Sequence, residues 1–225
     1  VKTDPDAEPH KQQSQILVPL PHPGVEIVGP MHVFGEDHAP RGHMHMKFNN
    51  VRVPKENMLL GQGRGFEISQ LRLGPGRIHH CMRTIGKAEI ALDLMVKRAM
   101  EREVHGGKLE TKQFVQGFIA DSYMDIQSAR LMTIHCAKLI EEGGDARTDI
   151  SALKVFVPAA FERVVDRSIQ VHGALGVSGD LPLAGMYTGA RTLRLADGPD
   201  EVHRVLIAKN VLKRYHEGQS WDFGA

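Results

Sequence analysis

Residues 194–204 read RLADGPDEVHR and open an amphipathic segment near the end of the chain. Behind this opening, apolar positions recur at the 3.6-residue period of a helix, at Val202, Val205, Leu206 and Leu212, with Lys209 among them. Pro199 therefore marks the start of a helix, with Asp200 and Glu201 in its first turn. Asp197 lies just outside that helix, beside Gly198, where no side chain blocks a ligand. Two interpretations of Asp197 stay open: a helix cap, or a general base held in a cleft.

Three further segments have the same period and predict long helices. Apolar stripes extend over residues 78–99, 115–140 and 150–171. Glycines end the second and the third stripe, at residues 143–144 and at residue 173. Because short polar turns join long helices of this kind into antiparallel neighbours, we expect a four-helix bundle.

The beginning of the chain is rich in β-formers instead. Short candidate strands occupy residues 15–19, 25–28, 43–48 and 51–54. We therefore predict an α+β fold: a partial β-barrel or sheet segment over residues 1–60, followed by an all-α four-helix bundle over residues 61–225. Because so few strands cannot close a sheet, we expect their missing partners to come from residues upstream of Val1.

The composition describes an ordinary globular chain. Of its 225 residues, 41% are hydrophobic and 24% are charged, and the net charge is +1. This balance predicts no nucleic-acid partner. Because no run approaches the roughly 18 apolar residues of a membrane span, we expect a soluble, intracellular protein. The two cysteines lie in helical patterns, which favours a reducing compartment over a disulfide framework. The 13 histidines show no zinc-ligand spacing, so no metal site is predicted.

Three glycine-containing segments each have two possible interpretations. Residues 61–66 look like a dinucleotide loop, but no βαβ unit surrounds them, which favours a strand-to-helix hinge. Residues 74–77, GPGR, interrupt the first helical stripe, either as a kink or as a break that something approaches closely. Residues 170–176, QVHGALG, are either a helix C-cap or a set of backbone donors exposed to a ligand.

Taken in order, these segments resemble the second half of an acyl-CoA dehydrogenase, from about Ser14 to Tyr215. The matching motifs are VRVPKEN at 51–57, GxGxGF at 61–66, an arginine on the first bundle helix, AMERxxxG at 99–106, Gln113, QxxGxxG at 170–176 and the carboxylate–glycine pair at 197–198. The segments GFEISQ at 65–70, LGPGRIHHCMR at 73–83 and LADGPDEVH at 195–203 are similar to the subgroup of acyl-CoA dehydrogenase family members 10 and 11.

The resemblance implies an FAD-dependent enzyme of the fatty-acid β-oxidation type, which desaturates an acyl-CoA thioester between Cα and Cβ. It implies that Asp197 is the α-proton base, and that the acyl-CoA site includes Gly74, Pro75, Gly76, Arg77 and Gly198. The implied FAD contacts are Arg102, Gln113, Gln170, Val171, His172, Gly173, Ala174, Pro199, Asp200 and Glu201. It further implies a homotetramer, built as a dimer of dimers in which a neighbouring subunit completes each flavin site. Electron-transfer flavoprotein is the implied electron acceptor, and bacterial cytoplasm, mitochondrion or peroxisome the implied compartment.

The sequence departs from the family pattern in several places. Most members have Glu at the position of Asp197 and Thr at that of Pro199, and Val104 and His105 replace a Thr and an aromatic residue. The family's N-terminal helical domain and part of its middle β domain are not in this sequence. Two other functions therefore remain under consideration: a catalytically silent helical assembly protein of the same fold, and an acyl-CoA oxidase.

Overall fold

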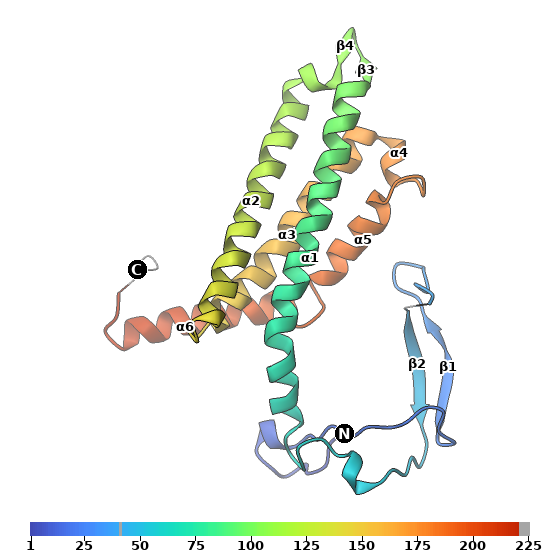
Figure 1. Cartoon of the computed structure of the whole chain (residues 1–225), viewed down its shortest axis with the longest axis vertical. Helices are drawn as coiled ribbons and strands as arrows, with labels where there is room; N and C mark the ends of the chain where they lie inside the picture. Colours follow the sequence, from blue (N-terminus) through green and yellow to red (C-terminus); the bar gives the residue numbers. More distant parts are fainter. Residues whose placement is uncertain (41, 221–225) are drawn as a thin grey trace. The chain divides into compact units, whose positions relative to one another are not determined.

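The computed structural model describes residues 1–40 and 42–220 (Figure 1). It divides into two compact units, Val1–Arg72 and Leu73–Ala225. The boundary lies inside helix α1 (Gly65–Glu101), later than the expected boundary at residue 61. Residues 65–72, about two turns of α1, belong to the first unit. Within this unit, the Gln15 side chain donates hydrogen bonds to the carbonyl of Gly65 and to the Ser69 hydroxyl, at 3.1 and 2.9 Å.

The first unit contains one β-hairpin, of strands β1 (Val25–Met31) and β2 (His43–Phe48). The strands are antiparallel, with Val25 opposite Phe48 and a register shift between Ile27 and Gly29. Short 3-10 helices occupy Pro9–Lys11 (η1) and Lys55–Asn57 (η2).

The other two predicted strands of this unit are wrong in the described part of the chain. Residues 51–54 form none, and residues 15–19 contribute only an isolated bridge from Ile16 to Met58. Prolines at 19 and 54 lack the N–H that a ladder needs. The hairpin also leaves large apolar side chains exposed on both strands, so it builds little core of its own.

The second unit contains the three long helical segments that the apolar stripes predict, the first of them being α1 from Leu73 onward. These are α1, α2 (Gln113–Glu141) and α3 (Arg147–His172), which lie side by side in Figure 1. Strands β3 (Glu103–Val104) and β4 (Gly107–Lys108) and a 3-10 helix, η3 (Leu109–Thr111), connect α1 to α2.

Helix α1 continues through Pro75, so a break at residues 74–77 is wrong. A single proline removes one backbone hydrogen bond. Packing on both sides of this point holds the helix: its first turn is bound by Gln15, and from Ile78 onward it packs against the core of the second unit.

Three shorter helices follow in the described part of the second unit: α4 (Ala174–Val177), α5 (Leu183–Leu193) and α6 (Asp200–His216). Helix α3 is central, since it contacts α2, α4, α5 and α6. The predicted set of four helices therefore omitted α5, whose glycines at 185 and 189 weaken the helical signal of the sequence. The helix after Pro199 begins where predicted, but the apolar side chains that revealed it are exposed in this chain.

Two apolar clusters form the core of the second unit. The larger joins α1, α2, α3 and α5 around Leu153, Val157 and Phe161 of α3, and both cysteines are buried and free. The smaller cluster joins Met95 and Ala99 of α1, Val115 of α2 and Val171 of α3. The second cluster shows that the C-terminal ends of α1 and α3 meet the start of α2 at one end of the bundle.

Candidate active site

The turn between α5 and α6 has a left-handed backbone at two successive residues. Asp197 has φ +56° and Gly198 has φ +106°. Glycine adopts this conformation freely and aspartate is one of the few other residues that tolerate it. Pro199, which has no N–H to donate, then leads into α6. The Asp197 carboxylate of this turn meets His80 of α1, whose Nε2 lies 3.2 Å from Oδ2.

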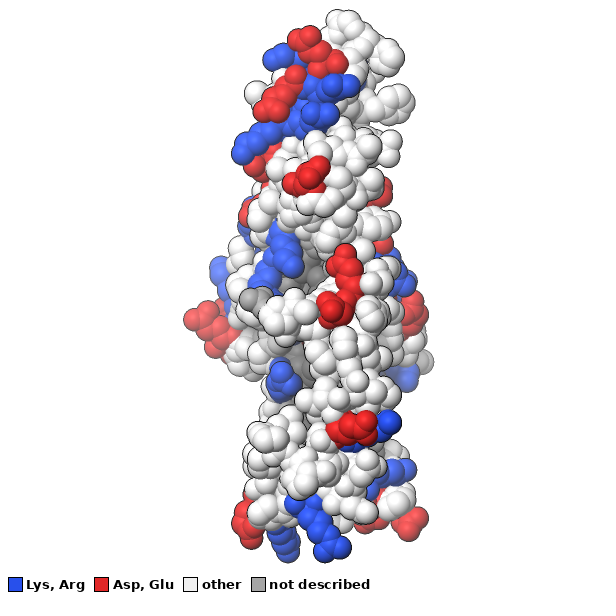
Figure 2. Space-filling view, turned by 90° about the vertical axis from the view of Figure 1, so that its right-hand side faces the viewer, with Lys and Arg blue, Asp and Glu red and all other residues white. Residues whose placement is uncertain are grey.

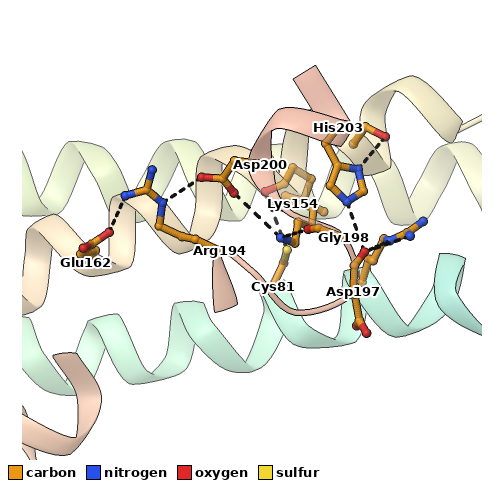
Figure 3. Close-up of polar contacts among 11 residues, drawn as sticks. Cys81, Lys154, Glu162, Arg194, Asp197, Gly198, Asp200 and His203 are labelled. Carbon is orange, nitrogen blue, oxygen red and sulfur yellow. Dashed lines mark hydrogen bonds and ion pairs between the residues drawn. The ribbon is translucent and has the colours of Figure 1, made fainter. Parts of the chain in front are cut away.

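Side chains from three helices bind the two carbonyl oxygens of this turn (Figure 3). Arg77 of α1 donates to the Asp197 carbonyl from Nε and Nη2, at 3.1 and 3.0 Å. The Nε2 atom of His203, on α6, lies 3.3 Å from the same oxygen. Lys154 of α3 donates from Nζ to the Gly198 carbonyl at 2.5 Å. The backbone of the turn is thus fixed by residues that are far apart in the sequence.

The contacts of His203 determine its tautomer. A carbonyl only accepts hydrogen bonds, so Nε2, which faces the Asp197 carbonyl, carries the proton. The other ring nitrogen, Nδ1, then accepts from the Ser151 hydroxyl at 3.1 Å. Burial lowers the pKa of His203, and the hydrogen bond to Asp197 only partly offsets this. His203 is therefore a neutral imidazole at neutral pH.

The Asp197 carboxylate borders a small hollow that is partly open to solvent and has about 10 Å³ of free space, room for about one water molecule. The hollow is lined by Arg77, His80, Cys81, Thr84, Lys154, Pro158, Leu193, Ala196 and Asp197. The Nε2 atom of His80 lies 3.2 Å from Oδ2 of Asp197. Burial lowers the pKa of His80, opposed by Asp197 and reinforced by Arg83. Burial also raises the pKa of the Cys81 thiol to about 12, which makes this cysteine a poor nucleophile.

A buried chain of charges lies under the turn. Lys154 and Asp200 are only 4% and 2% exposed, and their charged atoms are 3.9 Å apart. Arg194 donates to Asp200 at 2.8 Å and to Glu162 at 2.9 Å. Oδ1 of Asp200 accepts no hydrogen bond among the described residues. Burial lowers the pKa of Lys154, with Asp200 and then Asp197 opposing the shift. Two cations and two anions balance one another in this chain of contacts.

Three of the predicted substrate-contacting residues stand next to Arg77, the residue of α1 that binds this turn. Gly74, Pro75 and Gly76 form part of α1 directly before Arg77. A Cβ atom placed on either glycine would meet nothing within 4 Å, so both leave open space beside the helix.

Most predicted flavin-contacting residues lie at the other end of the bundle. The smaller apolar cluster brings together the end of α1, the start of α2 and the end of α3, and with them Arg102, Gln113 and residues 170–174. Arg102, Gln113 and Gln170 are exposed, as are Gly173 and Ala174, while Val171 and His172 are buried. Figure 2 shows charged side chains of both signs at the end of the bundle that carries β3 and β4.

The two groups of predicted site residues are far apart in one chain. Arg77 and Arg102 are 25 positions apart on or next to α1, which corresponds to about 37 Å along a straight helix. Among the other predicted flavin contacts, Pro199 and Glu201 lie beside the Asp197 turn. The side chain of Asp200 is directed into the charge network below that turn, which leaves its backbone for any ligand contact.

Sequence reasoning missed several residues of the site, namely His80, Ser151, Lys154, Arg194 and His203. One signal was present in the sequence. Lys154 stands between Leu153 and Val157 on the apolar stripe of α3, a position where an unpaired lysine is rarely buried. Its partners lie too far along the chain for sequence spacing to reveal them.

Two further observations concern other classes of function. Over residues 1–40 and 42–220, no group of three or more His, Cys, Asp or Glu side chains is arranged to hold a metal ion. None of the helices in this part of the chain is long and apolar enough to span a membrane.

Comparison with known proteins identifies relatives of this chain. Residues 63–212 match the family model "Acyl-CoA dehydrogenase, C-terminal domain". The chain is 50% identical to mouse acyl-CoA dehydrogenase family member 10 over 94% of its own length and 20% of that protein. It is 52% identical to rat family member 11, over 93% of its own length and 27% of the relative. The solved structure of a putative acyl-CoA dehydrogenase from Mycobacterium abscessus is 42% identical, with a TM-score of 0.91, over 94% of this chain and 53% of the other.

Proposed function

Because the chain belongs to the acyl-CoA dehydrogenase family, we propose that its complete polypeptide oxidises an acyl-CoA thioester between Cα and Cβ, with FAD as cofactor. The chain spans 20 to 27% of the two mammalian relatives and about half of the mycobacterial structure, so the activity is proposed for the whole protein. The observation that carries the proposal is the Asp197 turn. Its backbone is held by Arg77, Lys154 and His203, while its carboxylate borders the hollow.

The residues at the end of the bundle fit part of an FAD site. Arg102, Gln113 and Gln170 are exposed side chains that donate hydrogen bonds, which is the chemistry that a diphosphate requires. Gly173 is also exposed and has φ +64°, so a ligand has access to the backbone there. Bound FAD would supply the acceptor for the β-hydride.

In the proposed mechanism, Asp197 accepts the α-proton of the thioester. Aspartate is one methylene shorter than the glutamate common in the family, so the position of its backbone decides how far the carboxylate reaches. The contacts of Arg77 and Lys154 with the turn fix that position. The space beside Gly198 where a side chain would stand is filled by His203, since a Cβ atom built there would lie 2.9 Å from its Nε2. A substrate contact of Gly198 would therefore involve its backbone. Holding a base within reach of the α-carbon in this way lowers the entropic part of the barrier.

We further propose that two subunits share each active site. The Asp197 turn and the Arg102 end of the bundle are separated by about 37 Å along one helix. The two groups can form one site if the Arg102 end of one subunit lies against the Asp197 turn of a second subunit. A homotetramer built as a dimer of dimers provides this arrangement.

Electron-transfer flavoprotein is the proposed acceptor of the electrons, and fatty-acid β-oxidation the proposed setting. Anaerobic mixing of the FAD-loaded, full-length protein with a saturated acyl-CoA tests the proposal. We expect the flavin absorption band to bleach and a 2-enoyl-CoA product to form. A protein that binds no flavin would support the silent assembly protein instead, and rapid peroxide release in air would support an oxidase.

A further inference from the structure

Lys154 is an unusual residue for the interior of a helical bundle. It lies on α3, is 4% exposed and is flanked by apolar side chains of the main core. A buried ammonium group costs free energy unless it is paired and hydrogen-bonded. Its two nearest polar contacts are the Gly198 carbonyl, at 2.5 Å, and Oδ1 of Asp200, at 3.9 Å. Both belong to the segment that carries the proposed base.

We propose that Lys154 is a positioning residue: it holds the Asp197–Gly198 turn in its left-handed conformation and thereby fixes the Asp197 carboxylate. The catalytic part of this inference rests on the proposed function, because it assumes that Asp197 is the base. The structural part does not depend on that assumption.

The geometry of the turn explains why a donor is needed at this place. Two successive residues with positive φ turn the Gly198 carbonyl toward α3 and away from the helical hydrogen bonds of α6 (Figure 3). The Gly198 carbonyl is partly buried, a place where an acceptor without a donor is costly, and a lysine of α3 provides the donor. Breaking this bond would remove a principal restraint on the conformation of the turn.

The charges around Lys154 explain how the ammonium group is retained there. Asp200 offers it a carboxylate, and Arg194 holds the other oxygen of that carboxylate at 2.8 Å. Arg194 in turn contacts Glu162 of α3. The turn and the first residue of α6 are therefore both anchored to α3, one by a hydrogen bond and the other by ion pairs (Figure 3).

The test replaces Lys154 in the full-length, FAD-loaded protein. Lys154→Met removes the donor and keeps a side chain of similar length, and Lys154→Arg keeps a charged donor. The control is Lys97→Met, which changes an exposed lysine of α1 whose partner is Asp93. If Lys154→Met fails to fold because Oδ1 of the buried Asp200 loses its nearby cation, the double variant Lys154→Met with Asp200→Asn removes both charges. The double variant then takes the place of Lys154→Met in the same measurements.

The first readout is amide hydrogen exchange over residues 194–202. The backbone N–H of Ala196 donates to the Thr192 carbonyl at 3.0 Å and that of Asp200 to the Arg194 carbonyl at 3.2 Å, so both groups report the order of this segment. We expect exchange there to be about tenfold faster in Lys154→Met than in the wild type, and to be close to wild type in Lys154→Arg. Wild-type exchange in Lys154→Met would overturn the proposal.

The second readout is the rate of flavin reduction by acyl-CoA, measured beside acyl-CoA affinity. For Lys154→Met we expect the rate to fall by about 10- to 100-fold with little change in affinity, and Lys154→Arg to recover most of the rate. Equal losses in the Arg and Met variants would contradict a positioning role. If Asp197→Asn itself keeps the wild-type rate, the proposed function fails, and hydrogen exchange alone decides the structural part of this inference.

Discussion

Arg77 donates two hydrogen bonds to the backbone carbonyl of Asp197, at 3.1 and 3.0 Å, across 120 positions of sequence. A guanidinium group directed at a carbonyl fixes both the position and the orientation of that peptide, because its two N–H groups are rigidly spaced. The Asp197 side chain takes no part in this contact and borders the hollow, with Nε2 of His80 at 3.2 Å from its Oδ2. The contact explains how a short carboxylate can be held in place from its backbone.

Arg77→Lys separates the geometry of this contact from its charge. Lysine keeps the cation but loses the two spaced donors, so the turn has more freedom. We expect flavin reduction by acyl-CoA to slow by about tenfold in Arg77→Lys and further in Arg77→Met. Stopped-flow absorbance measures the rates. The control is Arg147→Met, which changes an exposed arginine that pairs with Asp145. Wild-type rates in both Arg77 variants would show that the contact has no role in catalysis.

His203 makes stability depend on pH. Burial lowers its pKa in the folded protein, whereas the unfolded chain binds a proton near the ordinary value of about 6.5. As the pH falls through that value, the unfolded state binds more protons than the folded state, so folding loses stability. Above it both states are neutral and the effect vanishes.

The measurement is the fall in thermal midpoint between about pH 8 and about pH 5.5, where the linkage effect of a histidine appears. We expect a smaller fall in His203→Asn than in the wild type, although the variant is less stable at every pH. His216, an exposed histidine at the end of α6, gives the matched control His216→Asn. An unchanged fall in His203→Asn would show that this histidine is not protonated on unfolding.

Gly198→Ala tests the left-handed turn directly. The residue has φ +106°, and a Cβ atom built there would lie 2.9 Å from Nε2 of His203. We expect unfolding free energy to fall by about 1–3 kcal/mol, measured by denaturant titration. Gly185→Ala is a control of opposite sign, because Gly185 lies in α5 with open space around it. Alanine there should raise stability by about 0.5–1 kcal/mol.

The shared active site predicts complementation between two inactive variants. Asp197→Asn and Arg102→Met each alter every site in a uniform oligomer. When the two chains are co-expressed, a mixed pair contains one site with both changes and one site with neither. We expect flavin reduction in part of the sites of the mixed preparation, about a quarter for random pairing in two-fold symmetric dimers. Activity no higher than the sum of the two separate variants would argue that one chain supplies the whole site.

Much of the second unit could be predicted from the sequence, because an apolar stripe that keeps the 3.6-residue period over about 20 residues or more indicates a helix. The three stripes predicted α1, α2 and α3. Pro199, followed by two acidic residues, predicted the start of α6. Helix α5 was missed because glycines interrupt its pattern over only 11 residues. The continuity of α1 through Pro75 depends on packing on both sides, which a local rule about proline does not include.

The candidate site was predictable only in part. The Asp-Gly-Pro sequence revealed the turn, since each residue type constrains the backbone locally. Lys154 and His203 bind the same turn from two helices, and no spacing along the chain shows that these side chains converge. The predicted FAD contacts at the Arg102 end of the bundle were implied by resemblance alone, and their role stays a prediction.

The most direct measurement of the central claim is the rate at which acyl-CoA reduces the flavin of Asp197→Asn in the full-length protein. The amide keeps the shape of the side chain and removes its basicity. We predict a rate at least about a hundredfold below wild type, with little change in acyl-CoA affinity. Asp93→Asn, at an exposed carboxylate of α1 that pairs with Lys97, is the control and should keep the wild-type rate. A wild-type rate in Asp197→Asn would contradict the account, because the α-proton would then be removed by another group.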